Sequence, residues 1–129
     1  MFIQIETESD VPIYLQLVHQ LIESVIRGEL KPGDTLPSVR MFAADLGVNM
    51  HTVNKAYHEL EAKKIIRIVP KSGVIIHTEA VRQANETDLN RLQHSFRPLI
   101  AEALVLGLKE DELSNLVMKL INSIKEGTS

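Results

Sequence analysis

The chain of 129 residues lacks several features that particular classes of protein need. It has no cysteine, which excludes a disulfide scaffold, a thiolate nucleophile and a cysteine-bound zinc site. No apolar run approaches the length of a membrane span, and the acidic, alternating N-terminus FIQIETESD is unlike a signal peptide. We therefore expect a cytoplasmic protein that does not enter a membrane.

Catalytic and metal-binding motifs are also missing. There is no glycine-rich phosphate loop and no HExxH motif. The closest histidine pair, His51 and His58, has no carboxylate between its members, and Ser38 has no evident catalytic base nearby in the sequence. We expect neither an enzyme nor a cofactor or metal site.

The most informative segment is LPSVRMFAADLGVNMHTVNKAYHEL, residues 36–60. It contains two short amphipathic helical patterns separated by Gly47, a residue that suits the left-handed position at a helix C-terminus. Ser38 and Asn49 each stand where an N-cap side chain is needed. The predicted buried faces are Phe42, Ala43 and Leu46 in the first pattern, and Val53, Ala56, Tyr57 and Leu60 in the second. Two such helices across a tight turn predict a helix-turn-helix.

The outer face of the second helix is almost entirely hydrogen-bonding and carries no acid; it comprises Asn49, Met50, His51, Thr52, Asn54, Lys55 and His58. The alternative is a small helical hairpin whose polar face only meets water. The next segment argues against it, because IIRIVP and VIIH flank the turn KSG and predict a β-hairpin. Its tip, Lys71, Ser72 and Gly73, is a cationic loop that suits phosphates. The combined pattern is typical of a winged helix.

These residues also resemble a known family. The run GELKPGDTLPSVRMFAADLGVNMHTVNKAYHELE is similar to the DNA-binding domain of GntR-type bacterial transcription regulators, and PIYLQLVHQLIESVIRGEL resembles their YtrA-type branch. The resemblance implies a dimeric, repressor-like protein without enzymatic activity. It also makes Arg40 and residues 49–55 the expected DNA contacts. One departure is Lys64, which stands where the family usually has glycine, and another is a wing that is less basic than usual.

Net charge is the main objection to DNA binding, because the chain carries −3 at pH 7. Residues 35–78, however, contain six lysine and arginine residues against three acids, which gives +3 for the segment that would touch DNA. Affinity depends on the local field, so an acidic chain can still present a basic face.

On either side of this segment the sequence predicts further helices. Residues 11–27 carry a broad apolar stripe, which favours core packing over a membrane-surface helix. Residues 31–37, KPGDTLP, predict a turn-rich connector. Beyond His77, a seam spaced by three and four residues predicts a helix that packs along a partner. Its residues are Leu89, Leu92, Phe96, Leu99, Ala103 and Leu106.

Pro98 lies inside this seam, so we expect it to kink the helix or to start a new one. Gly107 ends the seam, and the acids at 110–112 suit the first turn of a last helix. The two helical faces are too small to form a core of their own. They either pack on the winged helix or form a two-fold dimer, and we favour the dimer because recognition helices usually work in symmetric pairs.

The sequence thus predicts an α+β fold. A winged helix-turn-helix of three helices and a β-hairpin wing occupies residues 1–78, and a two-helix dimerisation region occupies residues 79–129. The predicted function is that of a repressor-type transcription regulator that binds an inverted-repeat operator in double-stranded DNA as a homodimer. The predicted DNA-binding residues are Ser38, Arg40, Asn49, Met50, His51, Thr52, Asn54, Lys55, Lys71, Ser72 and Gly73.

Within this set, Arg40 suits a phosphate or a guanine, and Thr52 and Lys55 suit phosphates. Asn49, His51 and Asn54 can reach base edges, and Met50 can pack on a thymine methyl group. A winged helix that docks on another protein is the alternative function. The sequence leaves the operator and any small-molecule effector open, although the tail is too short for a sizeable ligand-binding domain.

Overall fold

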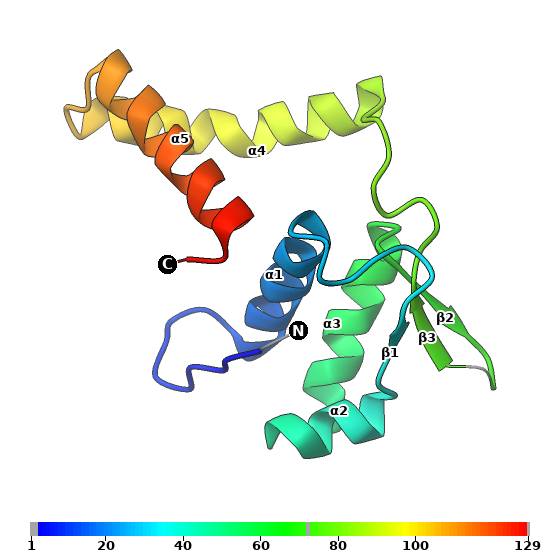
Figure 1. Ribbon diagram of the computed structural model, residues 1–129. Helices are drawn as coiled ribbons and strands as arrows, with labels where there is room; N and C mark the ends of the chain where they lie inside the picture. Colours follow the sequence, from blue (N-terminus) through cyan, green and yellow to red (C-terminus); the bar gives the residue numbers. More distant parts are fainter. Residues whose placement is uncertain (1–2, 72, 129) are drawn as a thin grey trace. The chain divides into compact units, whose positions relative to one another are not determined.

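A computed structural model describes residues 3–71 and 73–128 of the chain. These residues form two compact units, residues 1–81 and 82–129, which we call unit 1 and unit 2 and describe separately (Figure 1). The predicted α+β class and winged-helix architecture are confirmed. The elements of unit 1 are α1 (Ile13–Ile26), β1 (Thr35–Leu36), α2 (Val39–Leu46), α3 (Met50–Ala62), β2 (Ile66–Val69) and β3 (Gly73–Ile76), and those of unit 2 are α4 (Glu86–Val105) and α5 (Glu110–Glu126).

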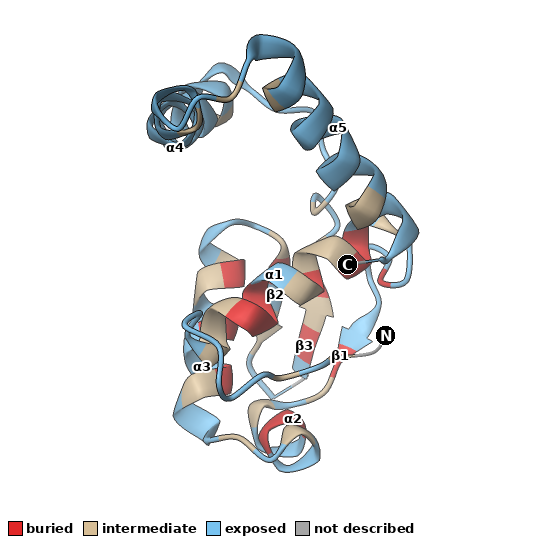
Figure 2. Cartoon of the chain, turned by 90° about the vertical axis from the view of Figure 1, so that its left-hand side faces the viewer, coloured by how far each residue is buried: buried red, intermediate tan, exposed pale blue. Residues whose placement is uncertain are grey.

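The buried residues of the described chain all lie in unit 1 (Figure 2). The apolar face of α3 is at the centre of this core, where Val53, Ala56, Tyr57 and Leu60 are fully covered. Residues of α1, α2 and the sheet pack around that face; they include Leu17, Leu21, Phe42, Ile66 and Ile76. The buried faces predicted for the helix-turn-helix are therefore confirmed, with Leu46 only partly covered.

A small sheet closes the core, and it has one strand more than the predicted hairpin. Strands β2 and β3 pair antiparallel in the register Ile66 to Ile76, as a wing requires. On its other edge β3 pairs with β1, in which Thr35 lies opposite Ile75. The expectation that residues 31–37 form only a connector was wrong at this point. A strand of two residues has no periodicity of its own, and it exists because β3 offers an unpaired edge.

The capping residues that shape the helix-turn-helix occupy their predicted places. Ser38 Oγ accepts a hydrogen bond from Met41 N at 3.2 Å, which caps α2. Asn49 Oδ1 accepts one from His51 N at 2.7 Å, which caps α3. Gly47 ends α2 in the left-handed conformation, with φ of 69°. Gly47 and Asn49 fix the turn that sets the direction of α3, and Ser38 fixes the start of α2.

The first helix begins later than expected and carries an unforeseen attachment. It starts at Ile13 because Pro12 is still extended, with ψ of 144°. Gln16 and Gln20, one turn apart, each bind an extended backbone segment. Gln20 exchanges two hydrogen bonds with the backbone of Gln4, and Gln16 does the same with Glu6. The N-terminal residues are thereby held along α1.

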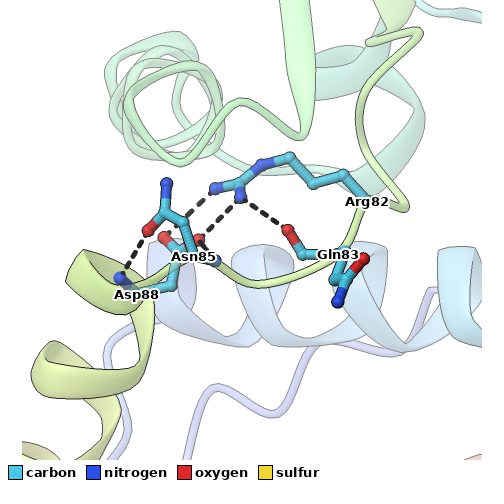
Figure 3. A network of polar contacts seen from close by, with 4 residues as sticks. All are labelled: Arg82, Gln83, Asn85 and Asp88. Carbon is cyan, nitrogen blue, oxygen red and sulfur yellow. Dashed lines mark hydrogen bonds and ion pairs between the residues drawn. The ribbon is translucent and has the colours of Figure 1, made fainter.

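In unit 2, α4 runs from Glu86 to Val105 with Pro98 inside it. Pro98 therefore does not start a new helix, which excludes one of the two expectations for this residue. The α4 N-terminus is tied by a capping box between Asn85 and Asp88 (Figure 3). Arg82 donates two further hydrogen bonds to the Asp88 carboxylate, at 2.6 and 3.1 Å. The hydrogen bonds from Arg82 and from the backbone of Asn85 lower the pKa of Asp88 to about 2.

Candidate nucleic-acid interface

The outer face of α3 is exposed, as its sequence predicts. Met50, His51, Asn54 and Lys55 are all exposed, whereas Thr52 is half-buried. No acid lies between Asn49 and His58 on this helix. The face therefore presents donors, acceptors and one methionine to its surroundings, without a carboxylate that would repel phosphates.

The two asparagines of this face differ in what they can offer to a ligand. The Asn49 side chain is engaged through its oxygen in capping α3. The Asn54 side chain forms no hydrogen bond with any other described residue, and only its backbone oxygen is engaged, by His58 Nδ1 at 2.8 Å. Reading an adenine bidentately requires both the oxygen and the nitrogen of one amide. Asn54 is thus the better suited of the two to this contact.

The remaining predicted contacts come from α2 and from the turn of the wing. Arg40 is exposed in the first turn of α2, and Ser38 is exposed at the cap of that helix. Lys71 and Gly73 are exposed in the β2–β3 region, and Ser72 lies outside the described residues. In Figure 1 the end of β2 and the start of β3 lie toward the same end of unit 1 as α2 and the start of α3.

Two lysines adopt a backbone conformation that favours glycine. Lys64, directly after α3, has φ of 60°, and Lys71 at the wing has φ of 67°. For a residue with a side chain this left-handed conformation costs roughly 1–2 kcal/mol. Lys64 thus adopts a conformation that glycine would adopt without steric cost. Lys71 bears the same cost, and this residue is exposed beyond the end of β2.

Side chains on the inner side of α3 hold its outer face in place. Tyr57 stacks on Phe42, with ring centroids 6.1 Å apart, and its hydroxyl donates to the Pro37 carbonyl at 2.7 Å. Burial raises the pKa of this hydroxyl, so it stays protonated and remains a donor. At the other end of the helix, Glu61 accepts a hydrogen bond from Ile68 N at 2.9 Å. These contacts fix α3 to α2, to the segment before α2 that contains Pro37, and to strand β2 of the wing.

One contact on this surface was missed from the sequence. The Lys55 ammonium lies 4.1 Å from the centroid of the Tyr14 ring, a distance typical of a cation–π interaction. In the sequence, Tyr14 is one of the residues of the broad apolar stripe over residues 11–27. The two residues are 41 positions apart in the sequence, so neither their spacing nor their residue types could predict the contact.

Unit 2 differs from this surface in being apolar and uncovered. Neither α4 nor α5 contains a buried residue. The predicted seam is exposed over most of its length, with 56% of Phe96, 66% of Leu99 and 71% of Leu106 accessible to solvent. The α5 face adds Leu116, Val117, Leu120 and Ile121, each more than a third exposed. A patch of this kind on a soluble protein usually marks an interaction surface.

The described residues lack two other kinds of feature, a metal-binding cluster and a membrane-spanning helix. No group of three or more histidine, aspartate or glutamate side chains there could hold a metal ion. None of the described helices combines the length and hydropathy that a membrane span requires.

Comparisons with known proteins agree with this geometry. Residues 13–76 match the family model described as bacterial regulatory proteins, gntR family. The chain is 34% identical to the HTH-type transcriptional repressor YtrA of Bacillus subtilis, over 97% of this chain and 96% of that protein. The chain belongs to the GntR family. The near full-length match to YtrA places it in the YtrA-type branch, and it is thus a DNA-binding regulator of transcription.

Solved structures extend the likeness to both units. A transcriptional antiterminator from Listeria monocytogenes EGD-e is 32% identical with a TM-score of 0.89, covering 100% of this chain and 96% of that one. The GntR-family transcription factor YtrA from Sulfolobus acidocaldarius is 39% identical with a TM-score of 0.57, covering 94% of this chain and 97% of that one. The helices after the wing therefore belong to the fold of these relatives.

Proposed function

We propose that this GntR-family protein is a sequence-specific repressor that binds an inverted-repeat operator as a homodimer. The observation that carries the proposal is the acid-free, exposed face of α3 in a helix-turn-helix whose turn is fixed by Gly47 and Asn49. Such a helix fits the major groove, where its N-terminal residues contact base edges. Because its proposed ligand is genomic DNA, the protein acts in the cytoplasm.

Within the half-site, Asn54 is the principal reader of an adenine and Met50 packs on a thymine methyl group. His51 supplies a further contact to a base edge. Arg40, Lys55 and the wing-tip Lys71 neutralise phosphates and set the register of α3, together with Ser38, Thr52 and Gly73. Asn49 acts mainly through its cap, because its oxygen is already engaged. This division supports a half-site in which A·T pairs dominate the positions under α3.

The second copy of the chain is held through unit 2. The dimer interface consists of the exposed seam from Leu89 to Leu106 and the apolar face of α5. Neither helix contains a buried residue within one chain. Burying such a surface contributes about 25 cal/mol for each Å² of apolar area removed from water. Two-fold pairing also presents two copies of α3 to the two halves of a palindrome.

Selection from a random duplex library tests this proposal. The recovered sequences are expected to contain an inverted repeat, and the affinity for the selected duplex is expected to fall steeply as salt is raised. A shuffled duplex of the same length and composition serves as the control. Recovery of no common sequence, together with salt-insensitive binding to a protein partner, would favour a protein-docking winged helix instead.

A further inference from the structure

The contact between Lys55 and Tyr14 joins the outer face of α3 to the first turn of α1. The Lys55 ammonium lies 4.1 Å from the Tyr14 ring centroid. Tyr14 is half-buried and packs against the core, so its ring is a fixed platform. Lys55 is exposed, and it takes no part in the salt bridges of the described residues, which are formed by Arg27 and Arg82.

A ring beneath an ammonium group leaves most of that group's hydrogen-bond donors free. Ring and cation attract each other through the charge distribution of the π-system, on one side of the nitrogen. The other side of the Lys55 ammonium remains open to an acceptor such as a phosphate oxygen. A lysine held in one place before binding loses less side-chain freedom when it binds. The Tyr14 ring therefore positions the Lys55 ammonium for a phosphate and leaves its hydrogen-bond donors free.

We propose that Tyr14 is a positioning residue for the phosphate contact of Lys55, so that α1 contributes to DNA affinity without touching the base edges. This inference rests on the proposed DNA-binding function. It extends the binding surface beyond α2, α3 and the wing to a residue whose ring acts through another side chain. It also predicts that the effect of Tyr14 disappears when Lys55 has no charge.

A double-mutant cycle on the full chain tests this coupling, with the duplex selected from the random library as the probe. Tyr14→Leu removes the π-system and keeps an apolar side chain, whereas Tyr14→Phe keeps the ring and removes only the hydroxyl. Tyr14→Leu is expected to weaken binding about two- to five-fold, and Tyr14→Phe to leave it unchanged. Lys55→Met should weaken binding and reduce the slope of log affinity against log salt by about 0.9 for each bound chain, or about 1.8 for a dimer on its operator.

The decisive arm combines Tyr14→Leu with Lys55→Met. We expect no loss beyond that of Lys55→Met alone. In a matched cycle with Lys71→Met, whose lysine lies on the wing, Tyr14→Leu should retain its full two- to five-fold effect. Thermal melting of each variant verifies that unit 1 is folded at the temperature of the binding measurement.

The outcomes separate this inference from the function on which it rests. If the unmodified chain bound no duplex in a salt-dependent manner, the proposed function itself would fail. If that chain bound as expected but Tyr14→Leu weakened the Lys55→Met protein to the same extent, Tyr14 would act on the fold and the inference would be overturned. Tighter binding by Tyr14→Leu would also overturn it, because the ring would then be withholding the lysine from DNA.

Discussion

Unit 1 and unit 2 differ in whether their apolar side chains are buried within the chain. In unit 1 the apolar faces of three helices and a sheet meet one another, and residues such as Leu17, Tyr57 and Leu60 are fully buried. In unit 2 two amphipathic helices of comparable length bury no residue at all. The first unit thus has a core of its own, and the second has an exposed apolar surface, which we propose to be the dimer interface. Changes in unit 1 should alter folding or DNA contacts, and changes in unit 2 should alter assembly.

The largest effect is expected from charges placed in the exposed seam of unit 2. Leu92→Asp combined with Leu99→Asp would put two carboxylates into an apolar interface, where they would have no partners. We predict monomers by sedimentation and an operator affinity lower by roughly 100-fold or more, because two linked half-site contacts become one. Unit 1 should melt as before. Asn90→Asp combined with Val105→Asp adds the same charge to exposed positions on the side of α4 opposite the seam, and it should leave the dimer intact.

The second effect concerns the face of α3. Asn54→Ala removes a side chain that no other described residue engages, so the fold should not change. Affinity for the selected operator should fall by about 1–3 kcal/mol for each half-site, with relaxed preference at one position in each half-site. Asn49→Ala is the contrasting variant, since it should lower the melting temperature through loss of a cap. An operator affinity that is unaffected by Asn54→Ala would contradict the proposed orientation of α3.

A change inside the core of unit 1 should affect stability without altering assembly. Tyr57→Phe keeps the stacking on Phe42 and leaves the Pro37 carbonyl without its donor. We expect a loss of about 1 kcal/mol in the free energy of unfolding, measured by denaturant titration. Dimerisation by unit 2 should remain as in the unmodified chain. A loss of dimer in this variant would show that the two units are not separable in the way described.

A substitution at Lys64, after the end of α3, should raise the free energy of unfolding instead of lowering it. Lys64→Gly relieves a left-handed conformation and should stabilise unit 1 by up to about 1 kcal/mol, part of the relief being offset by the greater freedom of glycine in the unfolded chain. Lys63→Gly is the matched control, because Lys63 has φ of −84° and gains nothing from glycine. If both variants were destabilised equally, the strain assigned to Lys64 would be absent.

The smallest effect is expected at the start of α4. The pKa of Asp88 is lowered from 3.8 to about 2, mainly by its hydrogen bonds with Arg82. The ionised carboxylate therefore stabilises the folded helix above pH 3.8, and this contribution disappears as the pH falls toward 2. Helical circular dichroism should decline across this range, and Asp88→Asn should remove that part of the decline. An identical acid titration of the variant would assign the loss to other carboxylates.

Much of unit 1 could be predicted because its signals are local. The caps Ser38 and Asn49, the left-handed Gly47 and the period of the apolar residues each depend on a few neighbouring positions. The strand β1 could not be predicted, because it exists only through its pairing with β3. The same holds for Lys55 and Tyr14, whose contact depends on how α1 packs on α3. In unit 2, the sequence left open whether the helix continues through Pro98 or a new helix begins there, and α4 continues through it.

The division of labour between the two units is the central claim, and the mass of the protein–DNA complex tests it most directly. Sedimentation of the full chain with a duplex carrying the selected inverted repeat should give two chains of 14.5 kDa on each duplex. The double variant Leu92→Asp/Leu99→Asp should bind as separate monomers, one chain on each half-site, with a far lower affinity. A single chain of the unmodified protein on the complete operator, at saturating concentration, would contradict the account.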